Sequence, residues 1–431
     1  MEETRPLLVE RRPDIVEPAA SEYSSSTTTT AVLRLAAFVT FTSSFDSGCA
    51  IGYSSAAESG IREDLGLTTA QYSVFASIFT FGAMLGATVS GKIADLIGRK
   101  KSIWLCDIFY VMGWLAILFA KGVWWLDFGR LTVGFGAGIQ SYVASVYVAE
   151  ITPKKIRGGF TAANMLVLCF GISLMFFMGN VLTWRTMAII GLVPCFVQSV
   201  GMFFIPESPR WLAKIGREKE LENTLRSLRG KNADIFSEMT EIRDYTKTFE
   251  QLSKTSILNL FERRYAHQLT IGVGIMLLQQ FGGSNGILYY ASSIFEAAGC
   301  SASVGTTTMA IIQIPFTALN VLLVDRSGRR PLLMGFQYSS ELCAILVLSG
   351  ILIFPVNIRG SAGSLVIFAN WFTAWIVSYS FNFLFDWSSP GVFFIFAAIC
   401  GSTILFVAKL VPETKGRSLE EIQASMTHLL Q

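Results

Sequence analysis

Charged side chains are scarce in this chain of 431 residues: Asp, Glu, Lys and Arg make up 15%, whereas hydrophobic residues make up 52%. A soluble domain carries more charge than this on its surface. The composition therefore argues against a soluble globular protein. The formal net charge of +3 is small and gives no reason to expect nucleic acid as a partner.

Histidine is also rare, and cysteines in the spacing of a metal or redox motif are missing. The chain has two histidines, and its seven cysteines form no CxxC pair and no Cys/His cluster, so neither a metal site nor a redox site is predicted. We find no combination of nucleophile and base and no phosphate-binding loop, so we predict no enzymatic activity and no cofactor.

A signal peptide with a charged start and an apolar core is missing from the first thirty residues. Residues 1–30 are polar and are predicted to form a disordered cytosolic tail. Within this tail Glu3, Leu7 and Leu8 have the spacing of an acidic dileucine sorting motif that adaptor proteins recognise. Short patterns of this kind also arise by chance, so both interpretations stay open.

Long apolar runs are abundant and approach the 20 or so residues that cross a bilayer as a helix. Because lipid cannot satisfy backbone polar groups, these runs predict an all-α membrane protein. We expect helices at 31–57, 72–90, 103–121, 124–149, 162–183, 185–205, 268–291, 303–324, 363–383 and 391–411, with a doubtful run at 338–355. This divides the chain into a bundle of six helices at 31–205, a polar linker with short helices at 206–266, a second bundle at 267–411 and a tail at 412–431.

Lysine and arginine gather in alternate loops, which predicts the orientation of the chain. Lys92 and Arg99–Lys101 follow the second expected helix, and Lys154, Lys155 and Arg157 follow the fourth. Both the amino terminus and the linker are therefore expected in the cytosol.

An internal repeat relates the two bundles. The segment GKIADLIGRKK at 91–101 is similar to VDRSGRRP at 324–331, Ile-Arg-Gly at 156–158 recurs at 358–360, and PESPRWL at 206–212 recurs as PETKGRSL at 412–419. Asp95 and Arg157 are 62 residues apart, whereas Asp325 and Arg359 are 34 apart. The second bundle therefore lacks about 28 residues, roughly one helix and a loop.

The doubtful run has an uninterrupted apolar core of only 13 residues, Leu342 to Phe354, which is short for a span. If it crosses the membrane, the chain has 11 spans and its tail lies outside the cytosol. If it enters and returns on the same side, the chain has 10 spans and both Arg359 and Lys415 are cytosolic. We leave both topologies open.

Together these motifs resemble the sugar porter family of the major facilitator superfamily, most closely its plant early-response-to-dehydration type. The resemblance rests on GKIADLIGRKK, GRLTVGFGAG, YVAEITPKKIRG, PESPRWL, QQFGGSNGILYYAS, VDRSGRRP, FANW and LVPETKGRSLEEIQ and covers nearly the whole chain. It implies two helical bundles around a central sugar site that opens alternately to each side.

The resemblance also implies which residues bind sugar. Those expected to bind it are Gln279, Gln280, Asn285, Gln313 and Asn370, with Tyr289 and Tyr290 stacking on the sugar or gating its path. Side-chain amides both donate and accept hydrogen bonds, as sugar hydroxyls do. The alternative is that these amides only bond helices to one another.

A cytosolic gate of salt bridges between the bundles is implied as well. Its expected members are Asp95, Arg99, Arg130, Glu150 and Arg157 in the first half, Asp325, Arg326, Arg329 and Arg330 in the second half, and Glu207, Arg210 and Glu413 at the bundle ends. We expect Arg130 and Glu150 together at the cytosolic end of one helix pair. The alternative is that these charges only set the orientation of the chain.

The sequence departs from the family pattern in the first bundle. Cys49 occupies the position at which proton-coupled members carry an acid, and Met165 occupies that of a common glutamine. Asp46 lies one turn before Cys49 and is a candidate to pair with Arg130 and to exchange a proton, with Asp107 as a weaker candidate. The alternative is that Asp46 is a polar residue near a cavity and never changes its protonation.

The sequence thus predicts a carrier of hexose-type monosaccharides, either facilitative or coupled to protons. Its partners are the sugar and the lipid bilayer, and the expected location is the vacuolar membrane, with the plasma membrane second. Because one helix is missing, the alternative is a regulatory or sensor protein that derives from a carrier and does not transport.

Overall fold

The computed structural model describes residues 30–153, 156–230, 233–252, 266–327 and 359–410, and these form helices and connecting loops without any strand. The doubtful run at 338–355 lies outside the described residues. So do the dileucine residues Glu3, Leu7 and Leu8 and the predicted gate residues Arg329, Arg330 and Glu413.

The first bundle contains six long helices that match the six runs predicted at 31–205. They are α1 (Ala31–Ala56), α3 (Thr69–Ile97), α4 (Arg99–Leu118), α5 (Val123–Ile151), α6 (Arg157–Met178) and α7 (Trp184–Phe204), with the short α2 (Glu58–Leu65) between α1 and α3. A helix of 29 residues such as α5 is about 44 Å long. That is enough to cross a bilayer.

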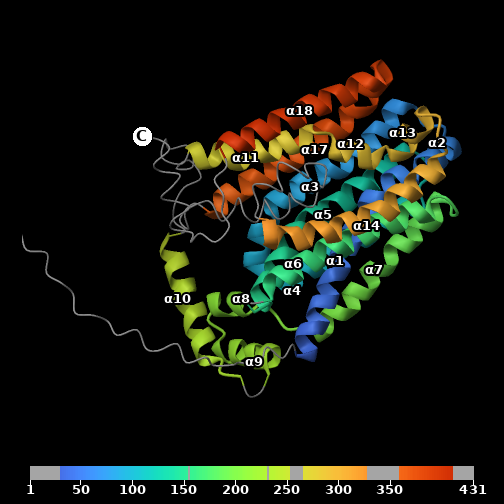
Figure 1. Cartoon of the computed structure of the whole chain (residues 1–431). Coiled ribbons are helices and arrows are strands. Elements are labelled where there is room, and N and C mark those ends of the chain that lie inside the picture. The colour runs from blue at the N-terminus through green and yellow to red at the C-terminus, as the bar shows by residue number, and fades with distance from the viewer. Residues whose placement is uncertain (1–29, 154–155, 231–232, 253–265, 328–358, 411–431) are drawn as a thin grey trace, which may run out of the picture.

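The linker forms three shorter helices, α8 (Pro209–Lys214), α9 (Glu218–Arg229) and α10 (Phe236–Leu252). They enclose a small core of their own, made of Trp211, Leu212, Leu221, Leu225, Ile235 and Ile242. These helices lie together at one end of the molecule, whereas α2 and α13 lie at the opposite end (Figure 1). We call these the linker end and the distal end.

The second bundle contains α11 (Ala266–Phe281), α12 (Ser284–Tyr289), α13 (Ala291–Ala297), α14 (Ala302–Ser327), α17 (Arg359–Trp387) and α18 (Ser389–Leu410). The helix predicted over 268–291 is interrupted at Gly282–Gly283. Gly283 has φ of 87°, a conformation that glycine adopts without steric cost, and a Cβ there would collide with the ring of Phe396.

Glycines let helices of the first bundle approach closely. A Cβ at Gly82 or Gly86 of α3, or at Gly134 or Gly138 of α5, would overlap a backbone carbonyl of the facing helix. Small residues at such contacts favour helix association in lipid, where the hydrophobic effect contributes little between helices. The α3–α5 pair is therefore fixed by backbone proximity.

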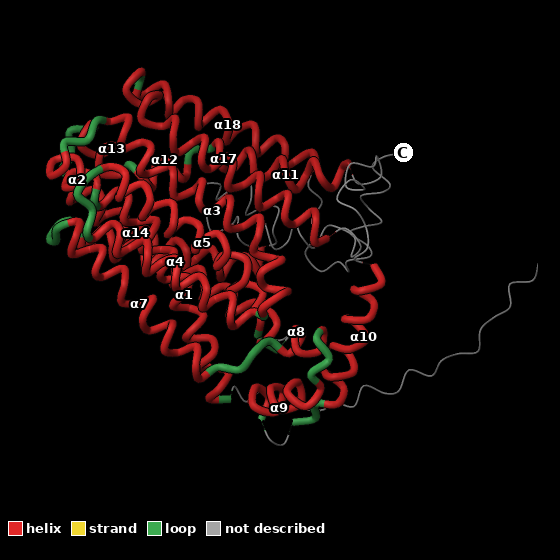
Figure 2. The backbone as a smooth tube through the Cα atoms, turned by 180° about the vertical axis from the view of Figure 1, so that it is seen from behind, coloured by secondary structure: helices red, strands yellow, loops and turns green. Residues whose placement is uncertain are grey.

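Seven helical segments in the described part of the chain are long and apolar enough to span a membrane: α3, α4, α5, α7, α18, most of α6 and the first part of α14. The two bundles pack along α3 and α17 and along α6 and α14, and α1 contacts α12 and α13. The tube in Figure 2 shows this side-by-side arrangement from behind. The described residues thus form two helical bundles that pack side by side.

Candidate functional site

A chain of three side-chain amides lies where α11 gives way to α12. Asn285 Nδ2 donates to Gln280 Oε1 over 2.7 Å, and Gln280 Nε2 donates to Asn370 Oδ1 over 2.8 Å. Asn370 belongs to α17, so two predicted motifs about 90 residues apart in sequence meet here. The interruption at Gly282–Gly283 gives α11 and α12 separate axes, and Gln280 and Asn285 bond to each other across it.

Two more polar atoms beside this chain lack a hydrogen-bond partner. Gln279 Oε1 and Ser284 Oγ are both buried and unpartnered in the part of the chain that the structure describes. A buried polar group without a partner costs about 1–3 kcal/mol, so Gln279 Oε1 is available to accept a hydrogen bond and the Ser284 hydroxyl to donate or accept one. Ser284 was not predicted, although its place in Gly-Gly-Ser-Asn, between Gln280 and Asn285, is a signal that could have pointed to it.

Tyr289 and Tyr290 are buried at the contact between the bundles. The ring of Tyr289 meets that of Phe79 on α3 edge-on at 6.4 Å, and the ring of Tyr290 stacks on that of Phe381 at 5.3 Å. The hydroxyl of Tyr290 donates to the carbonyl of Ser378 over 3.0 Å. Their contacts join helices of the two bundles.

Gln313 is half-buried on α14, next to the contact of this helix with α6. That contact includes a hydrogen bond of 3.1 Å from Ser173 Oγ to the carbonyl of Ala310. No hydrogen bond among the described residues joins the Gln313 side chain to the amide chain, so its part in the site stays a prediction.

Small polar side chains bond the bundles together at the distal end. Ser292 on α13 donates its N–H to Ser55 Oγ over 2.9 Å and its hydroxyl to the Ser55 carbonyl over 3.0 Å. Asn382 Nδ2 on α17 donates to Ser73 Oγ on α3 over 3.0 Å. The distal end is therefore closed in this conformation. The sequence analysis missed these residues, because serines and asparagines in apolar helices form no motif.

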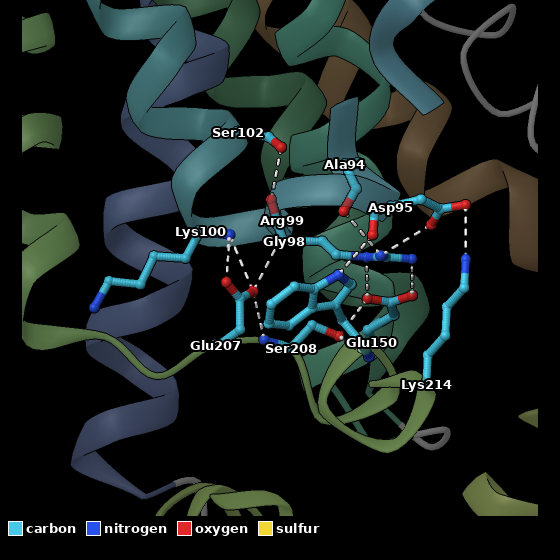
Figure 3. A network of polar contacts seen from close by, with 11 residues as sticks. Ala94, Asp95, Gly98, Arg99, Lys100, Ser102, Glu150, Glu207, Ser208 and Lys214 are labelled. Atoms are coloured by element: carbon cyan, nitrogen blue, oxygen red, sulfur yellow. Dashed lines mark hydrogen bonds and ion pairs between the residues drawn. The ribbon is translucent and has the colours of Figure 1, made fainter. Parts of the chain in front are cut away.

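A charged network lies at the linker end, where Figure 3 shows it. Arg99 donates to both carboxylate oxygens of Glu150 over 3.1 and 3.3 Å, and to Asp95 Oδ1 over 3.2 Å. Ser208 Oγ also donates to Glu150, and Lys214 pairs with Asp95 over 2.9 Å. Three predicted gate residues thus meet, all within the first bundle.

The carboxylate of Glu207 accepts hydrogen bonds from the backbone N–H groups of Arg99 and Lys100 at the start of α4, each over 3.0 Å. Glu207 fits here because a Cβ at Gly98 would collide with its carboxylate, and the amino-terminal end of a helix favours a negative charge. Burial raises the pKa of Glu207, whereas the N–H groups that it accepts act in the opposite direction. Glu207 therefore links the linker to the first bundle.

Part of the predicted gate lies outside the residues or side chains that the structure describes. Arg210 is half-buried at the start of α8, and Asp325 and Arg326 fall in the last turn of α14. The side chains of Arg157, Asp325 and Arg326 are outside what the structure describes. The second-bundle half of the gate thus stays a prediction.

The placement of Arg130 at the linker end was wrong. Arg130 and Glu150 lie 20 residues apart on α5, which separates them by about 30 Å along the helix axis. The guanidinium is fully buried, donates to the carbonyl of Ala50 over 2.9 Å and to Ser54 Oγ, and lies 4.7 Å from the ring centre of Phe79. These contacts fix Arg130 in the distal half of the first bundle.

The predicted pair of Asp46 with Arg130 does not form. Asp46 is buried, its Oδ1 accepts from Cys195 Sγ on α7 over 3.5 Å, and its Oδ2 has no partner among the described residues. Asp46 and Ser55 are nine residues apart on α1, or about two and a half turns. Since Ser55 meets the second bundle, Asp46 faces away from that bundle.

The other residues singled out in the first bundle lie in similar surroundings. Asp107 on α4 accepts from Gln198 Nε2 and Ser199 Oγ on α7, each over 2.8 Å. Cys49 is fully buried, and Met165 is half-buried on α6. The α1–α4–α7 side of the bundle therefore holds two buried carboxyl groups.

Comparison with known proteins agrees with this arrangement. A family model described as "Sugar (and other) transporter" matches residues 30–353 and 352–426. "Sugar transporter ERD6-like 10" from Arabidopsis thaliana is 46% identical over 438 residues, covering 92% of this chain and 96% of that protein. "Sugar transporter ERD6-like 7" from the same plant is 47% identical over 433 residues, covering 91% and 94%.

Solved structures share the fold. The proton:xylose symporter XylE bound to 6-bromo-6-deoxy-D-glucose matches with a TM-score of 0.72 at 24% identity, covering 90% of this chain and 99% of that one. XylE from E. coli in a partially occluded inward-open conformation matches with a TM-score of 0.73 at 21% identity, with the same coverage. The chain therefore belongs to the sugar transporter family and has the major facilitator fold.

Proposed function

We propose that this protein carries hexose-type monosaccharides across a membrane by alternating access. The observation that carries the proposal is the chain Asn285–Gln280–Asn370, flanked by the unpartnered atoms Gln279 Oε1 and Ser284 Oγ. Amides that already bond each other can exchange these bonds for sugar hydroxyls, which donate and accept alike. The names of the plant relatives and of XylE support a sugar as the substrate.

The conformation supports alternating access. The distal end is closed by contacts between the bundles, such as Ser55 with Ser292, whereas the described part of the linker-end network lies within the first bundle and linker. We propose that the linker end is cytosolic, as the lysines and arginines predict. The second-bundle partners that approach this network when the linker end closes are then Asp325, Arg326, Arg329 and Arg330.

Coupling to protons is the finer part of the proposal. Asp46 is buried on α1, and its Oδ2 has no hydrogen-bond partner among the described residues; an acid buried among membrane helices is a candidate for a function. Because it faces α7, any effect on sugar must pass through movement of α1. A pH step across liposomes containing wild type or Asp46→Asn tests this role, and an unchanged proton response in the variant excludes it.

We place the carrier in the vacuolar membrane, with the plasma membrane as the second location. The dileucine motif supports targeting by an adaptor. A fluorescent fusion of the full chain should move to another membrane when Leu7 and Leu8 become alanine. Unchanged localisation would remove the motif from the proposal.

The shortened second half does not by itself favour a regulator. The two pieces of the family match meet at residues 352–353, inside the interval from which the repeat predicts that a helix is missing. The relatives named above are all sugar transporters, so the alternative of a regulator that does not transport has no support from them.

Sugar uptake into proteoliposomes tests the function. We expect saturable uptake of radiolabelled hexose, and a fall of about tenfold or more for Gln280→Ala, because the variant leaves Asn285 and Asn370 without their shared partner. Asn223→Ala removes an exposed amide on α9 and should leave uptake unchanged. Binding of sugar without flux in the wild type would refute the carrier.

A further inference from the structure

A buried carboxyl group lies between the two bundles at the distal end. Glu58 opens α2, directly after α1, and its side chain is only 4% exposed. The Ser293 side chain on α13 interacts with this carboxylate, whereas Glu58 Oε2 is buried with no hydrogen-bond partner among the described residues. Three residues earlier, Ser55 makes its hydrogen bonds to Ser292 of the same helix. Glu58 is thus part of the contact that closes this end.

The charges around Glu58 only partly compensate it. Arg62, one turn later on α2, lies 3.6 Å away, is 37% exposed and also donates to Thr69. Glu296 on α13 acts as a like charge. The phenols of Tyr72 on α3 and Tyr290, which precedes α13, also interact electrostatically with Glu58. A single, partly exposed cation therefore faces a buried carboxylate and a second acid.

We propose that Glu58 is a protonation-dependent latch that holds the distal ends of the two bundles together. In the closed conformation the carboxyl group is removed from water, and its neutral form fits an environment with one partly exposed cation and an unpartnered oxygen. Opening separates α2 from α13 and returns the carboxylate to water. The proton is exchanged with the distal compartment alone, so the latch moves no net charge across the membrane.

The direction of the pH dependence follows from burial. Burial is the largest cause that raises the pKa of Glu58 from 4.5 to about 7 in the closed state, and exposure on opening restores the ordinary value. The closed state therefore gains relative stability as the distal pH falls below about 7, and this advantage is lost as pH rises through about 7. Between about pH 8 and pH 5.5 the ratio of closed to open protein should rise about thirtyfold.

Hydrogen–deuterium exchange of the full chain in nanodiscs tests the latch without any sugar, so its outcome is independent of the proposed transport. The readout is the opening equilibrium of segments 53–65 and 288–297, with labelling times corrected for the intrinsic effect of pH on exchange. We expect at least about tenfold more protection at pH 5.5 than at pH 8 in the wild type. Glu58→Gln should stay protected at both values, and Glu63→Gln, which changes an exposed acid on α2, should behave as wild type.

Two further variants move the midpoint in opposite directions. Glu296→Gln removes the like charge and should lower the pH at which protection is lost, whereas Arg62→Gln removes the cation and should raise it. Both residues are at least partly exposed, so these variants remain informative if Glu58→Gln fails to fold. Equal protection of the wild type at both pH values, or a midpoint that neither variant moves, would overturn the proposal.

Discussion

Removing Arg99 should destabilise the first bundle much more than removing an arginine from an exposed ion pair. The side chains of Arg99 and Glu150 are 11% and 8% exposed, and the pair is bonded through both carboxylate oxygens. Loss of one partner of a buried pair typically costs about 3–5 kcal/mol, because the other charge remains buried. After Arg99→Met, the bond from Ser208 would be the one that Glu150 keeps among the described residues, and we expect a loss of about 3 kcal/mol.

A double-mutant cycle separates the pair from the packing of the side chains. Arg99→Met, Glu150→Leu and the double variant are unfolded with sodium dodecyl sulfate in mixed micelles, and the free energies of unfolding are compared. The double variant leaves no unpaired buried charge at these positions, so the coupling energy should be about 1–3 kcal/mol.

The matched control is the pair of Arg226 with Glu222 on α9, which is 55% and 44% exposed with a closest distance of 2.7 Å. Solvent screening limits such a pair to below about 0.5 kcal/mol. If the coupling between Arg99 and Glu150 were no larger than that of the control, burial would not be what strengthens the linker-end network, and the reasoning would fail.

Two other predictions concern the packing and the pH response of the first bundle. Gly138→Leu places atoms against the carbonyl of Ala83 where α5 meets α3. We expect it to lower the free energy of unfolding by about 1–3 kcal/mol or to prevent folding, measured as the yield of monodisperse protein. The control Gly158→Leu, at a site with open space, should be tolerated. Burial raises the pKa of Glu207, so its contribution to stability is present at acid pH and is lost as pH rises through the raised pKa. Glu207→Gln should therefore flatten the dependence of the free energy of unfolding on pH. An unchanged slope would contradict this.

Much of the helical layout follows from the order of residues alone. Each of the ten runs from 31–57 to 391–411 overlaps a helix of the structure, because a segment in lipid must satisfy its own backbone polar groups and must be predominantly apolar. The amides of QQFGGSN and FANW were also predicted as one site, and the structure joins Gln280, Asn285 and Asn370 by hydrogen bonds. Their role in binding sugar stays a proposal.

Only the tertiary structure determined how far along the bundle each buried polar side chain lies and which neighbouring helix it faces. Arg130 lies in the distal half, Asp46 faces α7, and Glu58 is buried against the second bundle, and none of these could be read from hydropathy. An apolar run defines where a helix crosses the membrane, but the rotation of that helix is set by close contacts such as those of Gly82 and Gly138. A rotation of half a turn exchanges the face toward the second bundle for the opposite one, so only packing determines which polar side chains meet.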